Sequence, residues 1–182
     1  MSGTEQIKML MRYNAWANKK MFNAVAALPA GEALKERATL FKNMVSTLNH
    51  QCVVHLIWQA HLQGREHGMQ ALNTKVCPEL ALLWQAQQDI DAWYVDWADA
   101  LTTAQAGEIV KFTLIGGNDG SMRRGDIALH VVTHCSYHRG WVADLFFQVP
   151  AHPPSMDLPV YHREMQDIAD QRCEAPHIKR VT

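Results

Sequence analysis

The sequence predicts an all-α protein built around four long helices. Three of the four segments place apolar residues on one face at the spacing of an α-helix. The other is apolar nearly all round over residues 52–58, as expected for a central helix. Proline or glycine residues follow three of the segments and end them. A chain of 182 residues, 48% of them hydrophobic, can bury a sizeable core within one domain.

The first half of the chain predicts two helices. An amphipathic helix is expected from about Thr4 to Leu28, and Pro29 ends it. A second helix is expected from about Leu40 to Gln63, and it stops at Gly64. The apolar character of this second segment predicts a position in the middle of the bundle.

The third segment predicts a bundle helix followed by an extended arm. It begins at Pro78, a residue suited to the first helical turn, and continues to about Leu101 with apolar positions at alternating spacings of three and four. A β-branched and aromatic run over residues 108–115 comes next, and a glycine-rich stretch over 116–120 follows it. This pattern predicts a short extended arm or hairpin.

Two further helices complete the prediction. The fourth is expected over Asp126–Phe147, with Asp126 as its N-cap and Pro150 as its stop. A fifth, shorter helix is expected from Asp157 to about Cys173. Residues 174–182 have little apolar surface to bury and are expected to fray.

Charge and composition narrow the class of protein. A formal net charge of −1 argues against a nucleic-acid surface, which needs clustered Lys and Arg. The N-terminal segment has no signal-peptide pattern and no apolar run could span a bilayer, so we expect a cytoplasmic protein with a small-molecule substrate and no membrane association. The four cysteines form no Cys-x-x-Cys pair and are expected to be free thiols.

Two histidines in the fourth helix are the main candidates for metal ligands. His134 and His138 are four residues apart, so they differ by ~40° around a helix axis and lie one turn apart along it. Both rings can therefore reach one ion, as in helical zinc sites. The alternative is a pair of hydrogen-bonded core histidines, because this spacing arises by chance in a chain with ten histidines.

A third ligand has to come from a facing helix, and the second helix offers His50, His55 and His61. His50 and His61 share a face but lie ~16 Å apart, and His55 points ~140° away from His50. At most one of the three can therefore join the pair. Spacing alone does not choose among them, although Ser46 and Thr47 would give His50 polar neighbours.

Three motifs resemble the DinB-like proteins of the DinB/YfiT superfamily. They are Tyr13-Asn14-Ala15-Trp16-Ala17-Asn18, Thr47-Leu48-Asn49-His50 followed by Trp58, and His130 to Gly140, which ends in His-x-x-x-His-Arg-Gly. The last is the most specific. The likeness spans roughly residues 5–150, so we expect a core of about 4–150 and a C-terminal extension over 151–182. The resemblance implies a four-helix bundle with a long crossover and a divalent metal held by His50, His134 and His138.

The ligand set and the resemblance together suggest the chemistry. Neutral imidazoles suit zinc or nickel, with iron and copper as further candidates, and three protein ligands leave one coordination position open, as in catalytic sites. Members of the family include isomerases and transferases that use low-molecular-weight thiols, and hydrolases; relatives often form homodimers. A thiol cofactor and a homodimer are therefore expected. Trp141 stands where family members often have glutamine, a difference that alters specificity if this position contacts substrate.

Two functions of different classes follow. The first is a metal-dependent enzyme, a thiol-dependent S-transferase or isomerase or a hydrolase. The second is a non-catalytic protein of the stress response that binds a metal or a small ligand. A third option is a scaffold whose site has decayed. Neither a His-Glu-x-x-His nor a Gly-x-Ser-x-Gly motif is present to name a reaction, so no catalytic residue is assigned.

Two residues next to the candidate ligands are expected to have structural roles. Cys135 is turned ~100° from His134 and is expected to pack in the core. Arg139 is expected to form a structural salt bridge. The candidates for contacts behind the ligands or in a substrate pocket are Asn14, His130 and Trp141.

Overall fold

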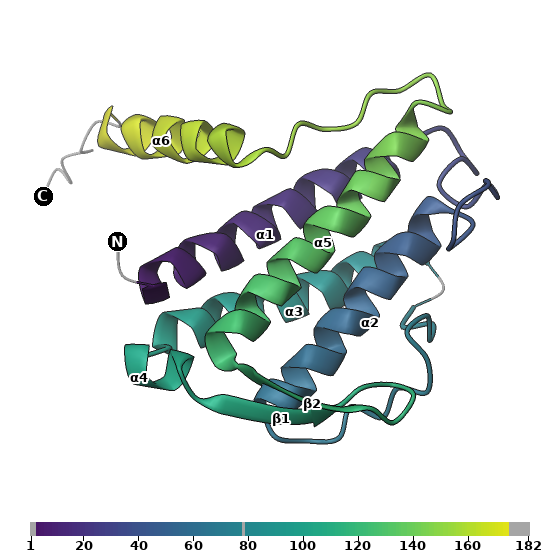
Figure 1. The fold of residues 1–182 in the computed structure, drawn as a ribbon. Coiled ribbons are helices and arrows are strands. Elements are labelled where there is room, and N and C mark those ends of the chain that lie inside the picture. Colours follow the sequence, from purple (N-terminus) through teal and green to yellow (C-terminus); the bar gives the residue numbers. More distant parts are fainter. Residues whose placement is uncertain (1–2, 78, 175–182) are drawn as a thin grey trace, which may run out of the picture.

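Four long helices form a bundle in the computed structural model, which describes residues 3–77 and 79–174 (Figure 1). They are α1 (Gly3–Ala26), α2 (Met44–Leu62), α3 (Leu80–Ala100) and α5 (Arg124–Phe146). A short helix α4 (Thr103–Ala106) and a hairpin of β1 (Ile109–Thr113) and β2 (Asp119–Arg123) precede α5, and α6 (Leu158–Glu174) follows it. The predicted all-α class, the extended arm and the C-terminal helix are confirmed.

Two predicted helix starts differ from the structure. Helix α2 begins at Met44 rather than at Leu40, because Lys42 adopts a positive φ of 67° and the Asn43 side chain caps the helix by accepting from the Ser46 amide. Helix α5 begins before Asp126, and Arg123 is its N-cap. The prediction of Asp126 as the cap is therefore wrong.

Asp126 instead lies in the first turn of α5, where its negative charge interacts favourably with the positive end of the helix dipole. The predicted start of the third helix at Pro78 lies outside the described residues, as does most of the tail predicted to fray. The predicted end of the fifth helix near Cys173 agrees with the end of α6 at Glu174.

Side-chain pairs define the direction of each helix in the bundle. Arg12 bonds Asp99 and Asn18 bonds Asp91, so α1 and α3 are antiparallel. In the same way His50 contacts His138 while Trp58 contacts His130, so α2 and α5 are antiparallel.

Helices α1 and α5 run parallel, since Ile7 lies beside Gly125 and Asn18 beside Arg139. Helix α2 packs against α5 and α3, while α1 packs against the same two helices from the other side. It follows that α2 and α3 are parallel neighbours. The segment between them must return along the bundle, which is the long crossover expected for this fold.

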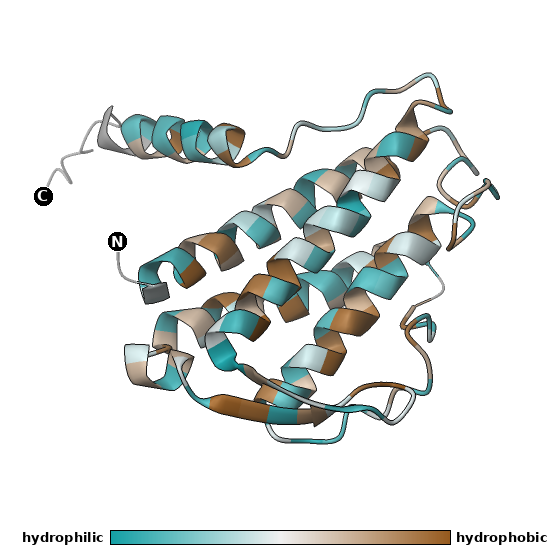
Figure 2. Cartoon of the chain, viewed as in Figure 1, coloured by the Kyte–Doolittle hydropathy of each residue, from teal (hydrophilic) through white to brown (hydrophobic). Residues whose placement is uncertain are grey.

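The core forms two clusters along the bundle axis. One lies toward the hairpin and centres on Met11, Trp58 and Tyr94, and the other lies at the far end and centres on Phe22, Leu48 and Phe146. Figure 2 shows apolar residues on the bundle helices and on β1, whereas α6 is mostly hydrophilic and lies beside α1. No described helix combines the length and the apolarity needed to cross a membrane.

The hairpin closes the lower end of the bundle in Figure 1. Its register places Phe112 opposite Gly120, and a Cβ atom at residue 120 would lie 2.5 Å from the Phe112 ring. Any other residue at this position would displace the Phe112 ring. Glycine lets Phe112 fold across the strand pair and pack on Trp58 of α2.

Candidate metal centre

Helix α5 supplies two imidazoles to one site because its histidines are spaced by one turn. His134 and His138 have ring centroids 4.4 Å apart, and both rings face α2. His138 is 5% exposed, while His134 is half-buried. Their positions on the inward side of α5 agree with the apolar stripe on which the sequence placed them.

Helix α2 supplies the third imidazole. The ring of His50 lies 4.5 Å from that of His138 and 5.2 Å from that of His134, centroid to centroid. One nitrogen of each ring can be chosen so that all three lie within 4.8 Å of one another. Of the three candidates on α2, the structure therefore brings His50 to the pair.

The returning segment between α2 and α3 orients His50. Asn49 anchors this segment, since its side-chain amide donates to the Thr74 carbonyl at 2.9 Å and its oxygen accepts from the Val76 amide at 2.8 Å. The Leu72 carbonyl lies 2.7 Å from Nδ1 of His50. A carbonyl can only accept, so Nδ1 carries the proton and Nε2 keeps a lone pair. A hydrogen bond of this kind fixes the tautomer and direction of a metal-ligating histidine.

Burial keeps the three imidazoles neutral. It lowers the pKa of His134 to about 2, helped by the neighbouring His138 and His50, and lowers the pKa of His138 to about 4, helped by His50. The pKa of His50 is also lowered by burial, against the bond to Leu72, which raises it. All three rings are therefore unprotonated near pH 7, the form in which a histidine binds a metal.

One nitrogen in each of the His134 and His138 rings has no hydrogen-bond partner among the described residues. Nδ1 of each is buried and makes no hydrogen bond with any described residue. A buried nitrogen without a partner is unfavourable, and such groups mark ligand or catalytic sites. The donor set, three neutral imidazoles without a carboxylate, suits zinc, nickel, copper or iron. The residues present therefore fit a divalent metal ion.

Aromatic side chains surround the three histidines. Phe41, from the segment between α1 and α2, stacks on His50 with centroids 4.4 Å apart and meets His138 edge-on at 5.8 Å. Trp141 lies 4.9 Å from the His138 ring and 6.1 Å from Phe41. Tyr137, largely exposed, packs against Trp141. Trp141 thus lies beside His138 and Phe41, next to the three-histidine cluster.

Of the other two candidates, His130 contacts a ligand ring, while Asn14 contacts the residue that follows a ligand. The His130 ring lies 5.6 Å from that of His134 and 4.9 Å from Trp58, one turn further along α5. Asn14 bonds Arg139, the residue after His138. His61 lies near the hairpin, against Phe112, with its Nε2 buried and without a described partner.

Arg139 belongs to a buried polar network rather than to a salt bridge. Its Nη1 donates to the side-chain oxygens of Asn14 and Asn18, at 2.7 Å each, and the Asn18 amide donates to the Asp91 carboxylate at 3.0 Å. The expected direct ion pair is therefore wrong, because Asn18 bridges the two charges. Burial raises the pKa of Asp91 to about 7, although the bonds from Asn18 and Gln87 oppose this shift.

The network continues to His55, which is fully buried. The Gln87 amide lies 3.0 Å from Nδ1 of His55 and 2.9 Å from Asp91 Oδ1, while Nε2 of His55 contacts the Cys135 sulfur. Burial raises the pKa of the Cys135 thiol, so it remains protonated. Cys135 therefore packs in the core, as predicted, and His55 is held away from the metal centre.

Three contributors to this region escaped the sequence prediction. Leu72 orients His50 through its main-chain carbonyl, and Phe41 reaches His50 through the conformation of a loop. No sequence pattern predicts either contact. The network had a detectable signal, because Gln87 and Asp91 are polar and four residues apart on the buried side of α3. Polar residues repeated at helical spacing on an apolar face indicate partners within the core.

The fold and the site together define a class: a helical-bundle protein with a candidate metal centre of three histidines from two antiparallel helices. The chain belongs to the DinB family, whose model matches residues 1–172, and the resemblance found in its motifs is confirmed. A search of curated proteins found no match.

Proposed function

We propose that this protein is a metal-dependent enzyme of the DinB family that uses a small thiol, either as an S-transferase or as an isomerase, with hydrolysis as the variant in which water replaces the thiol. One observation carries the proposal: three neutral imidazoles from two helices of the bundle meet at one point. When bound there, a divalent ion supplies the positive charge that favours deprotonation of a thiol or water at its open position.

The protein's own residues have three tasks in this proposal. His50, His134 and His138 hold the ion as neutral donors, and the Leu72 carbonyl fixes the direction of His50. Phe41 covers the His50 ring and excludes water from that side. Trp141 and Tyr137 form an apolar rim that suits the carbon skeleton of an electrophile.

A second function is favoured by one specific observation. The cluster of candidate ligands contains no carboxylate, so no acid or base stands among the described ligand groups. A protein that only binds a metal or a small ligand, for example in a stress response, needs none. Elemental analysis decides whether the metal-dependent functions have a basis, because protein purified without an affinity tag and free of metal would indicate a decayed metal site.

The deciding experiment combines metal content with turnover. Zinc- or nickel-loaded protein is mixed with a panel of low-molecular-weight thiols and an electrophile, and the loss of free thiol is measured. We expect turnover in the wild type and none in His138→Ala, while His162→Ala on the exposed surface of α6 serves as the matched control. Turnover that survives removal of the metal would rule out the enzyme proposed here, and stoichiometric metal without turnover would favour the binding protein.

We expect the protein to act in the cytoplasm as a homodimer on a small molecule, without nucleic acid or membrane as a partner. Its described cysteines, Cys52, Cys77 and Cys135, are free thiols, as is usual in a reducing compartment that also holds small thiols. Sedimentation of the purified protein tests the dimer.

A further inference from the structure

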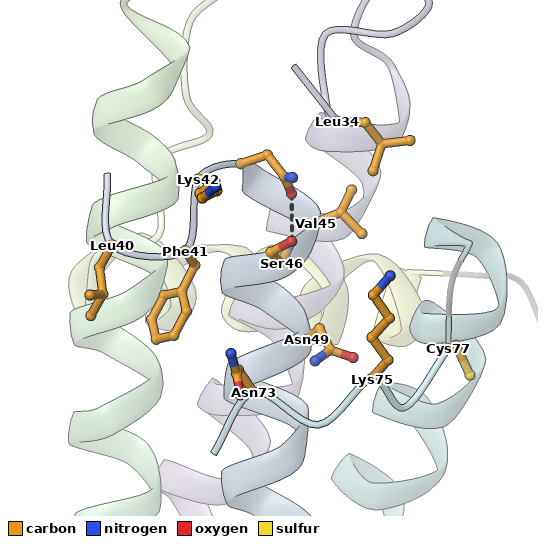
Figure 3. A pocket seen from close by; sticks show the side chains of 11 residues that line it. Leu34, Leu40, Phe41, Lys42, Val45, Ser46, Asn49, Asn73, Lys75 and Cys77 are labelled. Atoms are coloured by element: carbon orange, nitrogen blue, oxygen red, sulfur yellow. Dashed lines mark hydrogen bonds between the residues drawn. The ribbon is translucent and has the colours of Figure 1, made fainter. Parts of the chain in front are cut away.

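A cavity of about 370 Å³ opens over the first turns of α2 (Figure 3). Its walls come from the segment between α1 and α2, from α2 itself and from the returning segment before α3. This volume falls within the range of small-molecule sites, which is roughly 300–1,000 Å³. The cavity is large enough for part of a small metabolite.

The cavity shares a wall with the candidate metal centre. Phe41 lines the cavity and also stacks on the His50 ring at 4.4 Å. Asn49 and Asn73 line it too, and they adjoin His50 and Leu72 in the chain, the two residues joined by the bond that orients the imidazole. A molecule that contacts Phe41 in the cavity therefore lies close to the centre, because the same ring contacts His50.

The charged side chains that line the cavity are positive. Lys42 and Lys75 line it, and no acidic residue is among its described lining. Lys75 makes no ion pair with any described residue. Lys42 reaches Glu36 only at 3.8 Å, and both of these side chains are largely exposed. Figure 3 shows Lys75 extending beside α2 toward Val45. In a chain with a net charge of −1, two ammonium groups without a strong partner at one cavity favour an anion there.

The remaining lining is mixed. Leu34, Val45 and Cys77 contribute apolar surface, while Ser46 and Asn73 offer groups that hydrogen-bond. Such a lining accommodates a short carbon chain that ends in a charged, hydrogen-bonding group. A carboxylate has this chemistry, since it accepts bonds from ammonium and amide donors at once.

We propose that the cavity at the start of α2 binds the carboxylate end of a small-molecule substrate whose reactive group lies at the three-histidine centre. The inference rests on the proposed function, because it assumes that a substrate thiol is held at that centre. It adds the class of substrate: an acid, with its negative charge recognised by Lys42 and Lys75.

Binding measurements test the inference without any assay of activity. Zinc-loaded protein is titrated by calorimetry with mercaptocarboxylic acids of two to six carbons, each compared with the thiol alcohol of the same length. At the best length we expect the acid to bind roughly fivefold to tenfold more tightly than the alcohol, the range set by one or two partly exposed ion pairs.

Variants assign the preference to the cavity. The double substitution Lys42→Gln and Lys75→Gln should remove the preference for the acid and leave the affinity for the alcohol unchanged. The matched control is Lys111→Gln, since Lys111 lies on β1 at the other end of the bundle. Circular dichroism of each variant checks that the fold is kept.

The possible failures are distinct. If acid and alcohol bind the wild type equally at every length, or if the double variant keeps the preference, the inference is overturned while the thiol chemistry stands. If neither the acids nor the alcohols bind the zinc-loaded protein, the proposed function fails and the inference fails with it.

Discussion

Two groups of polar side chains draw on both α2 and α5, and both contain buried histidines. His55 is 0% exposed and bonds Gln87 and Cys135 through its two nitrogens. His134 and His138 each keep a buried nitrogen without a described protein partner. In both groups burial lowers the histidine pKa. The hydrogen bonds made by both nitrogens of His55, and not its burial, therefore separate it from the candidate ligands.

The same contrast applies to the elements that contribute. The network draws on all four bundle helices, through Asn18, Gln51, Gln87 and Arg139, and leaves one described side-chain oxygen, Oε1 of Gln51, without a partner. Such a network fixes the register of the helices. The three-histidine centre draws on two helices and opens toward aromatic residues near the surface. Changes in the network should reduce stability, and changes in the centre should reduce metal affinity.

The largest expected effect comes from removing the buried charge of the network. Arg139→Met leaves the oxygen of Asn14 without its donor and Asp91 without the nearby positive charge. We expect the free energy of unfolding of the metal-free protein to fall by about 3–5 kcal/mol. Urea denaturation measures it, with Arg163→Met on the exposed surface of α6 as the control. A loss below 1 kcal/mol would contradict the role assigned to the network.

The second effect concerns the centre. His134→Ala should weaken binding of zinc by more than about 100-fold, or about 2.7 kcal/mol. Substitution of a residue that only hydrogen-bonds to a metal ligand already lowers metal affinity roughly 10–100-fold, and loss of the ligand itself should lower it further. Competition with a chromogenic chelator measures the affinity. The unfolding free energy of the metal-free protein should stay within about 1 kcal/mol of wild type, since an imidazole nitrogen without a partner is removed. A large loss of stability with unchanged affinity would reverse the assignment.

The third effect sharpens the contrast between the two kinds of histidine. His55→Leu should lower the unfolding free energy by about 1–3 kcal/mol, because Gln87 and Cys135 lose their partner in the core. Metal stoichiometry should remain that of wild type. The opposite pattern, with stability kept and metal lost, would place His55 among the ligands.

The smallest effect is a dependence on pH. Burial raises the pKa of Asp91 from 3.8 in the unfolded chain to about 7. Between about pH 4 and 7 the folded state therefore holds a proton that the unfolded state has released, so this group's contribution to stability is lost as the pH rises. Relative to wild type, Asp91→Asn should become more stable over this window, by an amount on the order of 1 kcal/mol. Parallel stability curves for the two proteins would contradict the raised pKa.

The sequence predicted the fold well because its signals are local. Helical periodicity, Pro29, Gly64 and the glycine cluster before β2 place the long helices and the hairpin. The errors occur at the starts of two helices. Asn43 caps α2 through its side chain, whereas Arg123 is the N-cap of α5 without a side-chain bond, and periodicity does not distinguish either residue from its neighbours.

The site was predictable in part. The spacing of His134 and His138 follows from helix geometry, but the choice of His50 over His55 and His61 depended on the family resemblance. The physical reason for the choice appears only in three dimensions. There the Gln87 amide hydrogen-bonds to the His55 ring, and the Leu72 carbonyl orients His50. Whether the three rings bind an ion remains a prediction that elemental analysis tests.

The bond between the Leu72 carbonyl and His50 has a consequence for the variation that the chain can tolerate. The Leu72 side chain is 48% exposed and contributes nothing to that bond, so the residue type at this position is free to drift. The number of residues between Leu72 and the Asn49-bound pair, Thr74 and Val76, is not free, because one insertion or deletion there would shift the carbonyl away from the imidazole. Length, rather than identity, is the quantity under constraint in this segment.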